Sequence, residues 1–272
     1  MGTSGTDTNK EVAVAAKGAP VFPPQHGAWA FLGLPIILGA MVGGVTPLSV
    51  LLGIGFIVAY PASYFAIAIL RYPRPQRFRK GLWIWGSTGA VIAVLLIAAR
   101  PWLLWVGLVY AIAFAVNLAF ARAHNERSLL NDAVFILECV AIVPIMWAIN
   151  AGTTDLVPPP FVDAPTTLWT LTAFAALALV GSTMHVRSLI RERSNPRFRM
   201  LSQVFAGVSL ITSVALAYPY GMWALLCTAV AFGFLLVRSL LLGRRPMKPG
   251  IIGVFELVGF ILVAIAGGLC AV

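Results

Sequence analysis

Long runs of apolar residues alternate with short polar segments along nearly the whole chain. The runs cover approximately residues 27–44, 47–70, 82–99, 101–120, 129–150, 166–184, 200–218, 221–241 and 250–271. Most are close to the ~20 residues that an α-helix needs to cross a hydrocarbon core. In lipid, only helices and closed barrels pair all their backbone groups, and barrel strands would show about ten residues of alternating polarity. The pattern therefore predicts an all-α polytopic membrane protein with about nine transmembrane helices.

The composition agrees with this fold class and indicates two regions. Hydrophobic residues make up 60% of the 272 residues and charged residues 10%, against about 25% charged residues in soluble domains. Residues 1–22 lack the apolar core of a signal peptide and are predicted to form a disordered cytoplasmic tail. Residues 23–272 are predicted to form the transmembrane domain. The three cysteines fall inside predicted helices without a metal-binding spacing, and no metal or cofactor is expected.

The basic residues are distributed asymmetrically between the two sides of the predicted bundle. If the N-terminus is cytoplasmic, every Lys and Arg except Arg100 lies on the cytoplasmic side. This follows the positive-inside rule and predicts an external C-terminus at Val272. The net charge of +10 is explained by these loops, so membrane lipids are the expected partners and no nucleic acid is expected.

The first predicted helix begins with the segment PPQHG. Pro23 and Pro24 cannot continue a helix backward, so they set its start. The unpaired N–H groups and the positive dipole end of this helix then face the cytoplasmic boundary, where they can attract an anion. His26 at this end is a candidate to transfer a proton, and a boundary histidine without a function is the alternative.

A second polar group lies in ARAHNERSLLNDAVFILE. Asn131 and Glu138 share one helix face, which His124 and Arg127 join if the helix starts early enough. Glu138 lies about two turns inside the membrane, where a carboxylate costs roughly 2.5–3.5 kcal/mol, so it should face the bundle interior or water. Both a catalytic or ligand-binding Glu138 and a protonated Glu138 bonded to a neighbouring helix remain open.

A third group closes the sixth predicted helix in STMHVRSLIRERSNPRF. His185, Ser188 and Glu192 are spaced to share one face, and Arg187 and Arg191 are spaced to share another. The arginines fit either anionic lipid headgroups or a topology signal. A topology signal needs no histidine, so the His185 face favours a functional interpretation.

The connection after the second helix, RYPRPQRFRK, carries five positive charges and no acid. It suits contact with phosphate or phospholipid, with Arg74 and Arg77 as candidate ligands, and a plain topology anchor is the alternative. Glu256 is a second intramembrane carboxylate, for which the sequence indicates no partner.

The segments PPQHGAWAFLGLPIILG, RYPRPQRFRK and HVRSLIRERSN together resemble the YwiC-like family of bacterial membrane proteins. This resemblance implies a location in the bacterial inner membrane. A more distant likeness, carried by FARAHNERSLL and by polar groups after helices 2, 4 and 6, is to the UbiA prenyltransferase superfamily. That likeness implies a nine-helix bundle with a cytoplasmic N-terminus. Enzymes of that superfamily bind Mg²⁺-diphosphate through aspartate-rich motifs, which RYPRPQRFRK and HVRSLIRER lack, so no metal site is expected here.

The leading functional hypothesis is a polar, basic cavity open to the cytoplasm that binds an anionic amphiphile, either a lipid phosphate or an isoprenoid. A UbiA-like transferase without metal motifs is one form of it. The candidate catalytic residues are His26, His185, Glu138 and Glu192. The candidate ligand-binding residues are Arg74, Arg77, Arg127, Asn131, Arg187 and Arg191. A membrane transporter and a non-catalytic assembly or regulatory subunit are the alternatives.

Overall fold

The computed structural model describes residues 21–23, 28–125, 128–152, 154–242 and 247–272. Over these residues the chain forms nine α-helices and two short 3₁₀ turns. The helices are α2 (Ala28–Gly43), α3 (Pro47–Arg71), α4 (Gln76–Ala99), α5 (Leu103–Arg122), α6 (Leu129–Ala151), α7 (Thr166–Ile190), α8 (Pro196–Ala217), α9 (Met222–Leu242) and α10 (Pro249–Ala271). The turns are η1 (Phe161–Asp163) and η2 (Tyr218–Tyr220). The predicted all-α class and the number of helices are confirmed within the described residues.

Eight of the described helices are long and apolar enough to cross a membrane, and α2 is a shorter apolar helix. With 16 residues, α2 extends about 24 Å at 1.5 Å per residue. Because eight of the described helices have a membrane-spanning length and an apolar composition, the chain is an integral membrane protein with many apolar helices. Pro35, Pro61 and Pro144 lie inside α2, α3 and α6, respectively.

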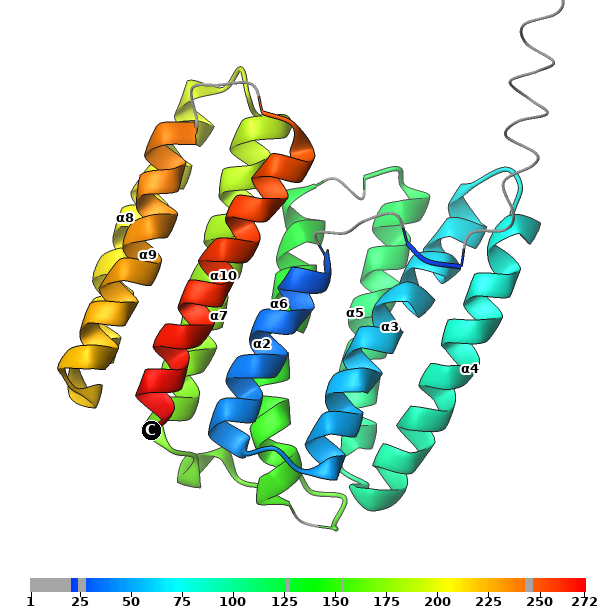
Figure 1. The fold of residues 1–272 in the computed structure, drawn as a ribbon. Coiled ribbons are helices and arrows are strands. Elements are labelled where there is room, and N and C mark those ends of the chain that lie inside the picture. The colour runs from blue at the N-terminus through cyan, green and yellow to red at the C-terminus, as the bar shows by residue number, and fades with distance from the viewer. Residues whose placement is uncertain (1–20, 24–27, 126–127, 153, 243–246) are drawn as a thin grey trace, which may run out of the picture.

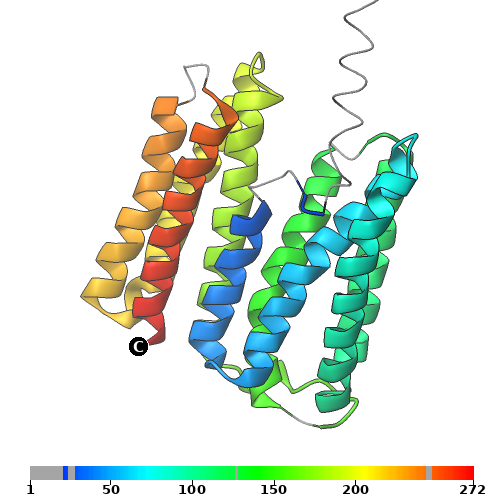
Figure 2. The same cartoon turned by 45° about the vertical axis from the view of Figure 1, so that its right-hand side comes forward.

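The helices form two layers (Figures 1 and 2). The nearer row in Figure 1 holds α9, α10, α2, α3 and α4, and the row behind it holds α8, α7, α6 and α5. Consecutive helices pack against each other around the bundle, and α10 packs against α2 to close the circuit. Across it, α2 also packs against α6 and α7, so that side chains fill the centre.

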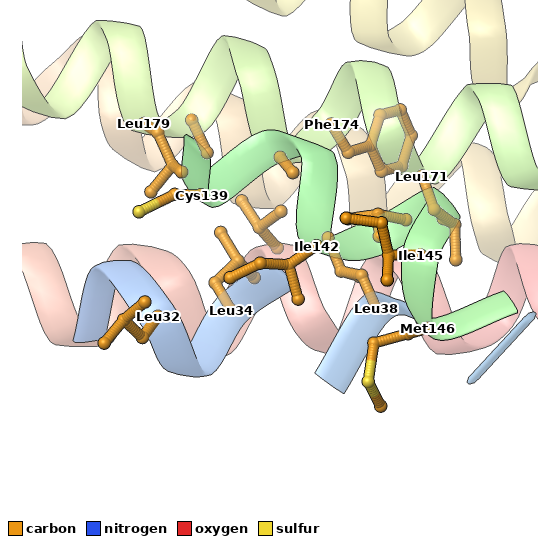
Figure 3. Packing of buried hydrophobic residues seen from close by; sticks show 14 of the residues in the cluster. Leu32, Leu34, Leu38, Cys139, Ile142, Ile145, Met146, Leu171, Phe174 and Leu179 are labelled. Atoms are coloured by element: carbon orange, nitrogen blue, oxygen red, sulfur yellow. The ribbon is translucent and has the colours of Figure 1, made fainter. Parts of the chain in front are cut away.

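The centre of the bundle is an apolar core between α2, α6 and α7 (Figure 3). Leu34 and Leu38 of α2 meet Ile142 and Met146 of α6 there, and α7 contributes residues such as Phe174. Gly39 and Gly43, one turn apart on α2, let α6 approach closely. A Cβ at Gly43 would lie 2.7 Å from the Cα of Trp147 and 2.8 Å from the carbonyl oxygen of Met146. Small residues at this spacing are typical of close helix contacts in membranes.

Several helices begin or end further into the polar segments than the sequence predicts. We predicted starts at residues 82 and 200, whereas α4 begins at Gln76 and α8 at Pro196; α7 continues to Ile190, past the predicted 184. Long basic side chains can extend toward water from a helix that continues below them, so hydropathy alone ends such helices too early. His185 consequently lies inside α7 rather than at its boundary.

The last turns of α3, α5, α7 and α9 and the first turns of α4, α6, α8 and α10 lie at one end of the bundle, and the C-terminus of the chain lies at the other (Figure 1). We call the first the basic end, because the described Lys and Arg residues other than Arg100 lie toward it. Most of the predicted tail lies outside the described residues. Within the described part, Val21 accepts a hydrogen bond from Trp85 Nε1 (2.7 Å), and Phe22 packs edge-on against Trp85.

Arg100, the basic residue at the opposite end, has a structural contact. Its Nε donates to the carbonyl oxygen of Ile149 (3.1 Å), near the C-terminus of α6 where carbonyls lack helical partners. Gly152 makes room for this side chain, because a Cβ there would lie 2.5 Å from Arg100 Nη2. This hydrogen bond therefore gives Arg100 a structural role that its charge alone does not explain.

We expect Arg100→Lys to lower the free energy of unfolding by about 1–3 kcal/mol, because a lysine cannot reproduce the guanidinium contact and leaves a carbonyl unpaired. The measurement is SDS-induced unfolding in mixed micelles. Arg122→Lys, at the exposed end of α5, is the control and should have little effect. Equal stability of the wild type and Arg100→Lys would contradict the capping role.

Candidate functional site

A buried ion pair joins α9 to α10 toward the basic end. Arg238 Nη1 contacts Glu256 Oε1, and Ser182 of α7 donates a hydrogen bond to Glu256 Oε2. Arg238 is 4% exposed, Glu256 6% and Ser182 0%. A charge inside the membrane is costly unless it is paired, so the pair explains how both residues can be buried.

The α9–α10 hairpin brings these two charges to the same depth. Arg238 lies four residues before the end of α9 at Leu242, and Glu256 lies seven residues after the start of α10 at Pro249. At 1.5 Å per residue, these offsets correspond to about 6 and 10 Å below the hairpin. Because the helices run in opposite directions, side chains at these offsets can meet.

His185 lies beside this pair. It is 2% exposed, and together with Arg238, Ser209 and Ser239 it lines a cavity of about 10 Å³ between α7, α8 and α9. Such a cavity holds about one water molecule. We call Ser182, His185, Ser209, Arg238, Ser239 and Glu256 the polar seam.

Besides the two atoms of the Arg238–Glu256 ion pair, two seam atoms are buried without a hydrogen-bond partner among the described residues. They are Nε2 of His185 and Nε of Arg238. Buried polar atoms without partners are rare in folded proteins. Both side chains line the same cavity, so the unpaired nitrogens mark the seam as a place where a small ligand can bind.

A separate ion-pair cluster joins α6 to the end of α7. Arg187 Nη1 lies 2.8 Å from Asp132 Oδ2, and Arg191 Nη1 lies 3.6 Å from the same oxygen. Arg187 Nε also lies 3.9 Å from Glu192 Oε1, and Asn195 Nδ2 donates to Glu192 Oε2 (3.1 Å). The two candidate arginines are therefore paired with acids within the protein.

The predicted face of His185, Ser188 and Glu192 is only partly formed. His185 and Ser188 are buried in α7, and the Ser188 hydroxyl donates to the His185 carbonyl oxygen (2.7 Å). Because α7 ends at Ile190, Glu192 leaves this face and contacts Arg187 instead. The expectation that Glu192 shares the His185 face was wrong for this reason.

Glu138 contacts the neighbouring helix α5. Its carboxylate accepts hydrogen bonds from Asn117 Nδ2 (3.2 Å to Oε2 and 3.4 Å to Oε1), and its main-chain oxygen accepts one from Tyr110 (2.5 Å). Asn131, one of the candidate ligand residues, is half-buried near the start of α6, where its backbone N–H donates to Ser128 Oγ (3.2 Å). Glu138 therefore joins α5 to α6, and its contacts differ from those of the polar seam.

The α3–α4 connection presents basic side chains to the surroundings. Arg71, Arg74, Arg77, Arg79 and Lys80 are exposed, and the first turn of α4 contains no acid. The Arg71 guanidinium lies 5.6 Å from the centroid of the Tyr72 ring, which packs against Phe78. This surface, residues 71–80, is called the α3–α4 basic surface below.

The remaining candidate residues lie apart from these groups or outside the described residues. His26 and Arg127 lie outside the described residues, so the predicted shared opening of His26 and His185 stays a prediction. His124 is exposed in the turn after α5, with a positive φ of 52°. Among the described residues, no three His, Cys, Asp or Glu side chains are grouped to hold a metal ion.

The sequence interpretation missed Arg238, the partner of Glu256. The positive-inside distribution includes Arg238 among the loop cations that set topology, although it falls inside an apolar run. The signal that would have identified it is the hairpin register, which places Arg238 and Glu256 at similar depth. Asn117, which bonds to Glu138, could be recognised only as a polar residue in an apolar helix.

Comparison with known proteins assigns the chain to a family. The model of the YwiC-like protein family matches residues 22–147. The "Uncharacterized protein YwiC" of Bacillus subtilis is 31% identical over 179 residues, which cover 65% of this chain and 70% of that protein. An "Uncharacterized protein" of Haemophilus influenzae is 24% identical over 246 residues, 89% of this chain and 96% of that protein. No solved structure matches the chain. The chain belongs to the YwiC-like family.

Proposed function

We propose that the protein binds the phosphate-bearing headgroup of an anionic amphiphile at the α3–α4 basic surface. The observation that carries this proposal is the set of five exposed cations between residues 71 and 80, without an acid in the same segment. Arginine and lysine attract phosphate strongly at a membrane surface, by about 1 kcal/mol for each residue. The ligand class is a lipid phosphate or an isoprenoid phosphate.

The contrast with α7 supports this location. Arg187 and Arg191 also lie toward the basic end, but Asp132 neutralises part of their charge. A phosphate would compete with that carboxylate for Arg187. No acid lies between residues 71 and 80, so an incoming anion meets no competing carboxylate from that segment.

The apolar surroundings suit the tail of such a ligand. Trp83 and Ile84 follow the basic residues on α4 and are 74% and 41% exposed, and Val91, Val94 and Leu95 continue this exposed apolar surface deeper along the helix. Tryptophan is enriched at membrane interfaces, where one part of its ring is apolar and another polar. The headgroup would contact the cations while the acyl or prenyl tail follows α4.

The orientation and location form part of the proposal. Because positive residues are retained on the cytoplasmic side, we place the basic end in the cytoplasm and the C-terminus outside. The membrane is proposed to be the bacterial inner membrane, since the relatives described above are bacterial proteins. The likeness to UbiA prenyltransferases stays a prediction, and the phosphate in this proposal is held by basic side chains.

We expect the double variant Arg74→Gln/Arg77→Gln to lose its preference for dioleoyl phosphatidic acid over dioleoyl phosphatidylcholine. Two charges at about 1 kcal/mol each correspond to roughly a 30-fold loss of affinity. The measurement is native mass spectrometry of the detergent-purified protein after titration with each lipid.

The control is Arg193→Gln/Arg197→Gln, which removes two exposed charges at the α7–α8 connection and should keep most of the preference. Equal losses in both double variants would mean that net charge, rather than the α3–α4 basic surface, attracts the lipid. Unchanged binding in Arg74→Gln/Arg77→Gln would also contradict the proposal.

A further inference from the structure

The polar seam lies outside the α3–α4 basic surface and requires its own explanation. A buried ion pair contributes little net stability, because the cost of removing two charges from water offsets their attraction. Apolar residues of similar size can be equally stable at such a position. Ionisable residues inside membrane helices therefore suggest a path or a site for ions.

We propose that the polar seam is a binding site for a halide-sized inorganic anion, held by Arg238, and that Glu256 takes up one proton when the anion binds. The site goes beyond the proposed lipid function and does not depend on it. Its parts are the Arg238–Glu256 pair, the Ser182 hydroxyl and the cavity that His185 and Arg238 share.

Charge balance couples the anion to the proton. Arginine stays protonated in proteins, so the buried guanidinium of Arg238 needs one negative charge beside it. The Glu256 carboxylate supplies that charge in the structure. When a proton binds to Glu256 and an anion binds to Arg238, one positive and one negative charge enter together, and the net charge of the seam is unchanged. Either event alone would leave a buried charge without a counter-charge, which is strongly unfavourable.

The unpaired nitrogens of the cavity suit an anion, and the volume of the cavity limits the size of that anion. Arg238 Nε and His185 Nε2 are buried nitrogens without a hydrogen-bond partner among the described residues, and their side chains line the cavity with those of Ser209 and Ser239. The cavity volume of about 10 Å³ admits a species about the size of one water. Among the halides, fluoride matches this size and chloride is somewhat larger, whereas a carboxylate or phosphate is larger still.

The groups around Glu256 are consistent with uptake of a proton there. Glu256 faces Arg238 of α9 and Ser182 of α7, and His185 lies one turn from Ser182 on α7. Helix α2 also packs against α10, and its described residues include no titratable side chain. The Ser182 hydroxyl donates to the carboxylate now and can rotate to accept from a protonated carboxyl group. A proton placed on His185 instead would put a second positive charge near Arg238.

The polar residues of α8 extend from the cavity toward the basic end. Ser209 lines the cavity, Ser202 is buried about two turns closer to the start of α8, and Gln203 Nε2 donates to the Ser239 carbonyl oxygen (3.3 Å). Small hydroxyl and amide side chains provide partners for water or an ion inside a helical bundle. We therefore infer entry from the basic end, along α8.

The test measures proton uptake when the whole protein, in phosphatidylcholine nanodiscs, is moved from sodium gluconate to sodium chloride at constant ionic strength. A pH-indicating dye in weak buffer reports the protons. We expect the wild type to take up close to one proton per protein. Glu256→Gln should take up none, because an amide cannot accept this proton. Phosphatidylcholine carries no net charge, so the outcome is independent of the anionic-lipid proposal.

A second variant covers the case in which Glu256→Gln fails to fold. Arg238→Gln/Glu256→Gln removes both charges together and should fold, yet take up no proton. No uptake by the wild type in chloride would overturn the proposal. Uptake that persists in either Glu256 variant, or that is lost in Glu138→Gln instead, would also overturn it.

Discussion

Removal of the Glu256 carboxylate alone should destabilise the protein by about 3–5 kcal/mol, because it leaves the buried guanidinium of Arg238 without a counter-charge. Glu256→Leu is the variant, and SDS-induced unfolding in mixed micelles is the measurement. Arg238→Met should have a similar cost, because it leaves the Glu256 carboxylate unpaired. These are the largest stability effects expected from single substitutions in the polar seam.

The double variant Arg238→Met/Glu256→Leu should recover most of this loss. Apolar pairs of similar volume often match or exceed the stability of the buried ion pairs that they replace. The coupling energy in this double-mutant cycle should therefore be large and favour the double variant. If the two single effects simply add, the charges do not compensate each other, and the pairing described here is wrong.

The second large effect is expected where α2 and α6 meet. Gly43→Ala should lower the free energy of unfolding by about 1–3 kcal/mol, as overpacking does in closely packed cores. The new Cβ would lie 2.7 Å from the Cα of Trp147, and backbone atoms cannot move aside as a flexible side chain can. Thermal unfolding in detergent micelles, followed by circular dichroism, measures the change.

Gly33→Ala on the same helix is the matched control. A Cβ at Gly33 would meet no atom within 4 Å, and alanine favours a helix over glycine by about 1 kcal/mol. Gly33→Ala should therefore leave the stability unchanged or raise it. If Gly43→Ala were equally harmless, the close approach of α2 to α6 would not be required for stability.

The sequence was sufficient to predict the class of the fold and the order of the helices. Apolar runs of membrane-spanning length are a strong signal because lipid requires every backbone group to be paired within the protein. The ends of the helices were less predictable. At Gln76 and Pro196, α4 and α8 begin in basic segments that hydropathy assigns to loops. A hydropathy average does not register side chains whose charged ends extend out of the membrane.

The polar sites were only partly predictable because they depend on packing between helices. Glu138 and Glu256 were identified as intramembrane acids from one helix each. Their partners, Asn117 and Arg238, lie on neighbouring helices, and single-helix periodicity carries no information about which helices pack together. Arg238 also has an ordinary role as a topology signal, and that interpretation concealed its place in the buried pair.

Covalent capture of a lipid tests the central claim most directly, namely that an anionic headgroup binds at the α3–α4 basic surface. A phosphatidic acid with a photoreactive group beside its phosphate would be added to the purified wild-type protein, irradiated, and mapped by peptide mass spectrometry. We predict that the adducts concentrate in residues 71–80 and decrease in Arg74→Gln/Arg77→Gln. Adducts concentrated at the α7–α8 connection, or spread evenly over the basic end, would contradict the claim.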